Sequence, residues 1–131
     1  MNILLIGTGG ALGAISRYVL TDAITKYFPT SQFIGTLSVN ILGCFLVGLL
    51  FGFFADMKSE IQVFFVIGFL GSFTTMSAFS IQTLEMFSNQ NFGEATLYIF
   101  MTIVFTIMST YIGLTLGAVS YTHLRAHETE S

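Results

Sequence analysis

The chain has 131 residues, of which 53% are hydrophobic and only 8% are charged, and its formal net charge is −3. A soluble domain carries roughly 25% charged residues, so this composition excludes a soluble protein and predicts an integral membrane protein. About 20 apolar residues span a hydrocarbon core of roughly 30 Å. The length therefore allows four crossings and leaves no room for a soluble catalytic domain. We expect no enzyme activity and no nucleic-acid partner.

The first two predicted crossings cover residues 3–20 and 33–54 and are rich in small residues. Gly48 and Gly52 form a small-xxx-small pattern, which favours close helix packing in membranes. Arg17 is the only basic residue close to a span. It either snorkels to the interface or neutralises an anion at a pore entrance, and the sequence leaves both interpretations open.

Asn40 lies near the centre of the second crossing, where a polar side chain is costly and marks a candidate site. Its carboxamide offers two N–H donors without a titratable charge. The simpler interpretation is an interhelical hydrogen bond. Thr36 lies one helical turn earlier on the same face, so the two side chains could act as successive donors along a path.

The third crossing is predicted over residues 61–87 and is interrupted. Residues 68–80 contain five hydroxyl side chains and two glycines, which weaken a helix or compete for its backbone groups. Irregular backbone in a membrane is tolerated only where protein or a water-filled cavity covers it. We therefore expect a helix that faces the protein interior and is broken near Gly71 to Ser77. Transporters often use such breaks to hold ions.

The fourth crossing is predicted over residues 94–119 and carries a row of hydroxyls. Tyr98, Thr102 and Thr106 are spaced by four, and Thr110 extends the row. Hydroxyls without a carboxylate suit a strongly hydrated anion better than a proton or a metal cation. The alternative is that each threonine bonds only the carbonyl four residues earlier in its own helix.

Residues 120–131 differ abruptly from residues 1–119, which form the predicted channel domain. This tail holds both histidines of the chain, His123 and His127, at i, i+4 spacing. We interpret it as disordered or non-native, because chain ends are poorly ordered unless they are tied down. We do not assign the histidines as metal ligands.

The charges give almost no orientation signal. Arg17 and Lys26 fall on one side of the membrane and Lys58 and Arg125 on the other, whereas a fixed topology normally shows an excess on one side. This balance predicts insertion in both orientations and antiparallel pairing. The alternative is an orientation set by features that the rule does not count.

Three separated segments resemble the Fluc (CrcB) family of small fluoride channels, in the family's order and spacing. They cover residues 9–18, 35–43 and 68–80, and with the fourth crossing the resemblance spans about residues 3–117. Met76 departs from the family, which usually has a phenylalanine there, and Ala78 replaces a common hydroxyl residue. Conduction rate or anion discrimination could differ as a result.

The resemblance implies an antiparallel, dual-topology homodimer with two fluoride pores and one structural sodium ion at its centre. The sodium ligands would be the main-chain carbonyls of Gly71 and Thr74. A heterodimer of two homologous chains is the alternative, and the balanced charges favour the homodimer. The candidate fluoride pathway comprises Arg17, Thr36, Asn40, Thr75, Met76, Ser77, Phe79, Tyr98, Thr102 and Thr106.

The resulting functional prediction is a fluoride-selective passive channel that lowers cytoplasmic fluoride, as a multi-pass protein of the bacterial inner membrane. A selective pore must replace the ion's water shell with compact donors. The alternative is a proton-coupled exporter of small cations, like the small multidrug transporters, which requires a membrane-embedded acid. All candidate acids lie in or near predicted loops: Asp22, Asp56, Glu60, Glu85 and Glu94. A purely structural membrane subunit would leave the polar rows unexplained.

Overall fold

The computed structural model describes residues 2–29, 31–54 and 60–130, and most of these residues lie in helices. Helix α1 covers Asn2–Tyr27, α2 covers Gln32–Phe53 and α6 covers Phe92–Glu130. Between α2 and α6 lies a third segment, Glu60–Ser88, composed of α3 (Glu60–Gln62), the π-helix η1 (Val63–Leu70), α4 (Gly71–Phe73) and α5 (Met76–Ser88). Four of the described helical spans are long and apolar enough to cross a membrane. The predicted all-α fold with four crossings is therefore confirmed.

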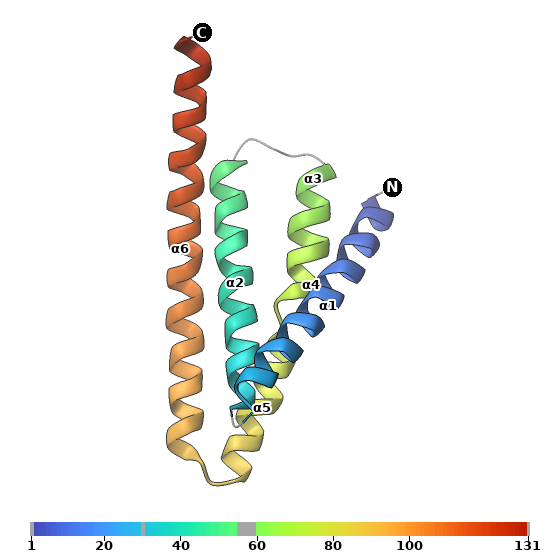
Figure 1. Cartoon of the computed structure of the whole chain (residues 1–131), viewed down its shortest axis with the longest axis vertical. Coiled ribbons are helices and arrows are strands. Elements are labelled where there is room, and N and C mark those ends of the chain that lie inside the picture. The colour runs from blue at the N-terminus through green and yellow to red at the C-terminus, as the bar shows by residue number, and fades with distance from the viewer. Residues whose placement is uncertain (1, 30, 55–59, 131) are drawn as a thin grey trace.

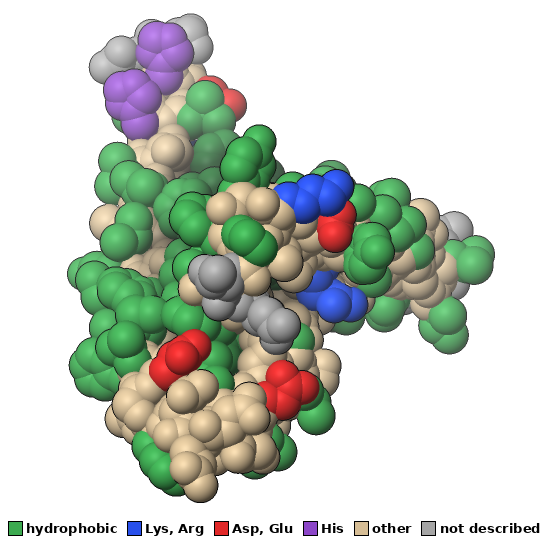
Figure 2. Space-filling view, turned by 60° about the horizontal axis from the view of Figure 1, so that its bottom comes forward, with side chains coloured by type: hydrophobic (Ala, Val, Ile, Leu, Met, Phe, Trp, Pro, Cys, Tyr) green, Lys and Arg blue, Asp and Glu red, His purple; other side chains and the backbone are tan. Residues whose placement is uncertain are grey.

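The four spans run up and down, and both chain ends lie at the same end of the molecule (Figure 1). Helices α2 and α6 and the third segment stand side by side, while α1 crosses the third segment obliquely. Figure 2 shows apolar side chains spread over these helices, with only scattered charged ones. This surface suits a protein that is surrounded by lipid.

Helices α2 and α6 approach until their backbones touch, and glycines on both helices make this possible. A methyl group added to Gly48 would overlap the carbonyl of Thr110, and one added to Gly113 would overlap the carbonyl of Phe45. Gly52 and Gly117 repeat the arrangement one turn further along. Membrane helices associate through such close packing, because lipid supplies no hydrophobic driving force between them. The small-xxx-small pattern of α2 thus packs against α6.

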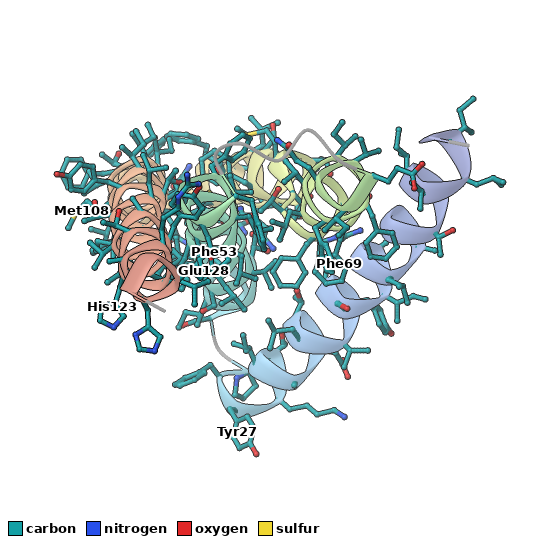
Figure 3. All side chains as sticks on the ribbon, turned by 90° about the horizontal axis from the view of Figure 1, so that it is seen from above. Tyr27, Phe53, Phe69, Met108, His123 and Glu128 are labelled. Carbon is teal, nitrogen blue, oxygen red and sulfur yellow. The ribbon has the colours of Figure 1, made fainter. Side chains whose placement is uncertain are left out.

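A second glycine contact joins α1 to η1. Methyl groups added to Gly9 or Gly13 would overlap the carbonyls of Phe64 and Phe69, and Gly68 faces α1 from the other side. Figure 3 shows the Phe69 ring between α1 and the third segment. This contact brings the third segment against α1 just before residues 74 and 75.

Two helix boundaries differ from those expected. Helix α1 continues to Tyr27 instead of ending near residue 20. Its last turns are supported by the Asp22–Lys26 ion pair at 3.5 Å and by the Thr25 hydroxyl, which donates to the Thr21 carbonyl at 2.8 Å. No residue before Pro29 forces the helix to stop.

Helix α6 likewise continues through residues 120–130, where we expected disorder or a non-native tail. The Arg125 Nη1 donates to the Tyr121 hydroxyl at 3.0 Å, one turn earlier. Leucine, arginine, alanine and glutamate in this stretch are good helix formers, so the helix runs past the apolar span. That this stretch is non-native stays a prediction.

Candidate functional site

The site begins where the third segment leaves the helical conformation. Thr74 has φ −80° and ψ 153°, and Thr75 has φ −144° and ψ 119°, so both are extended, between α4 and α5. We call these two residues the break. Gly43 of α2 faces it, and a methyl group there would overlap the Thr74 side chain and lie 3.1 Å from the Phe73 ring. The missing side chain at Gly43 lets the break pack directly on α2.

Asn40 holds the break through both ends of its carboxamide. Its Oδ1 accepts the backbone N–H of Thr75 at 2.8 Å, and its Nδ2 donates to the Thr75 carbonyl at 3.2 Å. Asn40 is 7% exposed, so these bonds satisfy a buried polar side chain. The carboxamide therefore takes the place of a helical backbone partner and keeps one N–H hydrogen for another contact.

Arg17 reaches the third segment from α1. Its Nε donates to the carbonyl of Ser72 at 3.1 Å, just before the break. Neither interpretation from the sequence included this contact, because Ser72 lies 55 residues further along the chain. The guanidinium thus satisfies a carbonyl that the interrupted helix leaves without its usual partner.

Thr75 also caps the start of α5. Its Oγ1 accepts the Ala78 N–H at 3.2 Å and lies 3.1 Å from the Ser77 Oγ. Among the described residues, the N–H groups of Met76 and Ser77 make no such bond outside their own helix. Free N–H groups and the helix dipole make such a terminus favourable for an anion.

An open groove of about 210 Å³ lies beside the break, between α2, α5 and α6. Most of the residues predicted for the pathway line this groove. Its lining contains neither a carboxylate nor a cationic group. The Met76 side chain is 74% exposed at its edge. The lining residues are Asn40, Cys44, Thr74, Thr75, Met76, Phe79, Thr102 and Thr106.

Five predicted residues lie outside this lining: Arg17, Thr36, Gly71, Ser77 and Tyr98. Tyr98 packs against the lining residue Phe79, with the two ring centroids 4.9 Å apart and the ring planes at 62°. Thr36 is 2% exposed and lies one turn before Asn40 on α2. Tyr98 is 1% exposed and packs in the core with Leu37.

The hydroxyl row of α6 divides into two kinds of residue. Thr106 donates its hydroxyl hydrogen to the Thr102 carbonyl, and Thr110 donates to the Thr106 carbonyl at 3.0 Å. Both hydroxyls therefore donate to carbonyls of their own helix. Thr102 is 8% exposed, and its hydroxyl has no hydrogen-bond partner among the described residues. The residue lines the groove, while its hydroxyl oxygen is buried.

Gln82 is a polar residue of this region that the sequence analysis missed. The Tyr98 hydroxyl donates to its Oε1 at 2.8 Å. A signal was present, since Gln82 is a carboxamide within an apolar span, one turn after Phe79. Its partner on α6 could not be read from the sequence.

The carbonyls of Gly71 and Thr74 fit a hard cation. In a continuous helix they would accept the N–H groups of Thr75 and Ala78, four residues later. Here these two N–H groups bond to the Asn40 Oδ1 and the Thr75 Oγ1 instead. Both carbonyl oxygens are thus left without a helical partner, and oxygen ligands of this kind suit a hard cation.

Taken together, the fold and the groove define a small four-span membrane protein with an uncharged groove beside the two extended residues of its third segment. Residues 4–114 match the family model described as CrcB-like protein, Camphor Resistance (CrcB). The chain belongs to this family.

Curated relatives cover nearly the whole chain. A protein of Magnetococcus marinus named fluoride-specific ion channel FluC is 36% identical over 120 residues, which is 89% of this chain and 98% of the relative. A protein of Dehalococcoides mccartyi with the same name is 40% identical over 120 residues, covering 89% and 92%. One of Campylobacter jejuni, also so named, is 36% identical over 114 residues, covering 86% and 93%.

Proposed function

We propose that the chain is the subunit of a fluoride-selective, passive ion channel that lowers cytoplasmic fluoride. Its similarity to relatives named fluoride-specific ion channel FluC, over 89% of its own length, carries this conclusion. The family match covers the break and the groove as well. The protein is a multi-pass membrane protein, and we place it in the bacterial inner membrane.

The chemistry of the groove suits this function. Fluoride holds water tightly, so a path must offer compact donors in place of the hydration shell. The unpartnered Thr102 hydroxyl, the remaining N–H of Asn40 and the start of α5 are donors of this kind. The Phe79 ring adds an edge with partial positive charge. No lining residue carries a charge that would trap or repel the ion.

The assembly we propose is an antiparallel homodimer of chains inserted in both orientations. The balanced basic residues support it. The groove supports it too, because its edge at Met76 is 74% exposed and needs a further surface to become a closed path. A second copy of the chain would supply that surface.

The interrupted third segment would serve this assembly as a broken helix with a sodium ion at the centre. Gly71 and Thr74 would hold the ion through their main-chain carbonyls, which lack helical partners for the reason given above. Bound there, the cation would neutralise carbonyl dipoles that face one another at the centre of the dimer. The ion would be structural, with the fluoride path beside it.

A proton-coupled exporter of small cations is less favoured. Such a transporter needs an acid at membrane depth, and the groove lining contains none. Glu85 and Glu94 lie near the turn between α5 and α6 instead.

A flux measurement tests the proposal. The full chain is reconstituted in liposomes loaded with fluoride or chloride, and anion efflux is followed with ion-selective electrodes after the membrane potential is shunted with a potassium ionophore. We expect fast fluoride efflux and no chloride efflux above that of protein-free liposomes. Equal efflux of the two anions, or fluoride efflux that requires a proton gradient, would overturn the proposal.

A further inference from the structure

The two histidines of the chain lie on the part of α6 where we expected disorder or a non-native tail. Residues 120–130 are helical instead, and we call them the arm. Tyr121 anchors the start of the arm, because its ring packs against Phe53 at the end of α2 with the centroids 6.3 Å apart. The spacing of His123 and His127 therefore corresponds to a defined geometry, which it would not in a disordered tail.

The arm extends beyond the apolar part of the membrane. Helix α6 has 39 residues and at about 1.5 Å per residue it is about 58 Å long, whereas the hydrocarbon core is roughly 30 Å thick. Figure 1 shows α6 continuing past the end of α2. A metal ion dissolved in water can therefore reach the arm without entering lipid.

His123 and His127 share one face of the arm. Residues four apart on a helix differ by about 40° around its axis and have Cβ atoms about 5–6 Å apart. Both side chains are exposed. Figure 2 shows the histidine side chains next to each other at the free end of α6, and Figure 3 shows His123 pointing away from the other helices.

The cation of the arm lies on the opposite face. Arg125 is two residues from each histidine, which is about 200° around the helix. Its Nη1 donates to the Tyr121 hydroxyl at 3.0 Å. Its positive charge is therefore directed away from the face that the two imidazoles share.

We propose that His123 and His127 form a binding site for a divalent transition-metal ion such as Ni²⁺ or Zn²⁺, each through one ring nitrogen. Imidazole is a preferred ligand of these ions, and two histidines four apart on a helix can bind one ion together. Among the described residues, no group of three or more His, Cys, Asp or Glu could hold a metal ion. Water therefore fills the remaining positions, and the ion is exchangeable.

This site is separate from the fluoride pathway. It requires only that residues 120–130 are helical, whatever their origin. In the antiparallel homodimer proposed above, the two arms lie on opposite sides of the membrane. Each chain therefore binds its own ion.

Calorimetric titration with NiCl₂ tests the site. The full chain is purified in detergent without a polyhistidine tag, which would itself bind the ion, and is freed of metal with EDTA before dialysis. We expect one Ni²⁺ per chain. His123→Ala and His127→Ala should each weaken binding at least about tenfold, because loss of even an outer-shell partner of a metal site costs about 10–100-fold in affinity.

An exchange variant tests whether the shared face matters. Thr122→His combined with His123→Thr keeps the composition but places the histidines five residues apart, about 140° around the helix. Thr122 is exposed, and its hydroxyl donates to the Ala118 carbonyl of its own helix at 2.9 Å. We expect this variant to bind Ni²⁺ as weakly as the single alanine variants.

Hydrogen exchange gives an independent measurement. An ion that bridges two turns binds the helical arm better than the unfolded one, so Ni²⁺ should slow amide exchange within residues 120–130 of the wild-type chain. It should leave exchange there unchanged in the combined variant His123→Ala and His127→Ala.

Three results would overturn the proposal: Ni²⁺ binding no tighter than in the combined alanine variant, wild-type affinity in the exchange variant, or amide exchange in the arm that Ni²⁺ does not slow. None of these measurements involves fluoride flux. Failure of the proposed function would therefore leave them unchanged.

Discussion

The contact between α2 and α6 and the break in the third segment are stabilised by different interactions. In the first, glycines such as Gly48 and Gly113 bring two backbones together, and no polar side chain is required. In the second, the backbone has lost its helical bonds, and Asn40 and Arg17 supply replacements from α2 and α1. The first contact depends on the absence of side-chain volume, and the second on the donors and acceptors of particular side chains.

This difference separates the supporting helix pair, α2 and α6, from the break beside the groove. A regular helix pair leaves no backbone group free, so it can stand in the membrane but offers nothing to an ion. The break exposes carbonyls at Gly71 and Thr74 and N–H groups at the start of α5, beside the groove. The polar side chains that bond to the break therefore also determine which groups lie beside the groove.

The largest expected effect on stability tests the glycine contact between α2 and α6. In Gly48→Ala the new methyl group overlaps the Thr110 carbonyl, so the helices must separate. Overpacking typically costs about 1–3 kcal/mol, and we expect a lower unfolding temperature in detergent and little folded protein. Gly7→Ala is the control, because nothing lies within 4 Å of its new methyl group. Equal unfolding temperatures for the two variants would contradict the glycine contact.

The largest expected effect on fluoride efflux tests the polar contacts of the break. Asn40→Asp keeps an acceptor for the Thr75 N–H but sets a carboxylate against the Thr75 carbonyl and beside the ion. At 4 Å and an effective dielectric of about 20, repulsion of a second anion is about 4 kcal/mol, roughly a thousandfold in occupancy. Fluoride efflux should nearly vanish at neutral pH and recover partly in acid, where the protonated side chain regains a donor.

The control for Asn40→Asp is Gln62→Glu, which makes the same amide-to-acid change away from the groove. It should leave efflux within about twofold of wild type, because Gln62 is not part of the groove lining. Asn40→Asp with normal efflux at neutral pH would remove Asn40 from the pathway.

A smaller effect distinguishes residues within the hydroxyl row. Thr102→Val removes a buried hydroxyl without a partner from a residue that lines the groove, whereas Thr106→Val removes a hydroxyl that is bonded to its own helix. We expect fluoride efflux to fall about tenfold in the first variant and less than about twofold in the second, as for loss of one charge-assisted hydrogen bond. Equal losses would show that the row acts as a unit and that the hydrogen bonds of Thr106 exchange with the ion.

The smallest effect concerns Met76. Its side chain is 74% exposed at the edge of the groove, so a larger ring meets no obstacle within the chain. Met76→Phe supplies a ring edge that can face an anion, and efflux should be unchanged or moderately higher. Abolished efflux in this variant would show that Met76 does not occupy an aromatic position of the pathway.

The number and type of helices could be predicted because they depend on local composition. Each apolar span has the length that a membrane requires, and Gly48 and Gly52 show a packing face on α2. The helix ends were less predictable. Residues 21–27 and 120–130 continue helices because no breaker stops them, although they are too polar to be assigned to a span.

The candidate pathway was predictable as a set of residues but not as a set of contacts. A polar side chain within an apolar span is a candidate site residue because it is costly at membrane depth. Asn40, Thr102 and Thr106 could therefore be named from the sequence. Their roles differ in ways that the sequence does not show. Asn40 uses both ends of its carboxamide on Thr75, and Thr106 donates to its own helix, while Thr102 remains free to donate.

The sequence by itself determined that this protein crosses the membrane four times and carries neutral donors at membrane depth. The reason is that the composition of each segment determines whether that segment can lie in lipid. Only the tertiary structure decided which donors are free. A hydrogen bond depends on where the partner lies, and Arg17 with Ser72, Asn40 with Thr75 and Tyr98 with Gln82 meet across separate helices. Close glycine packing brings those helices within reach of one another.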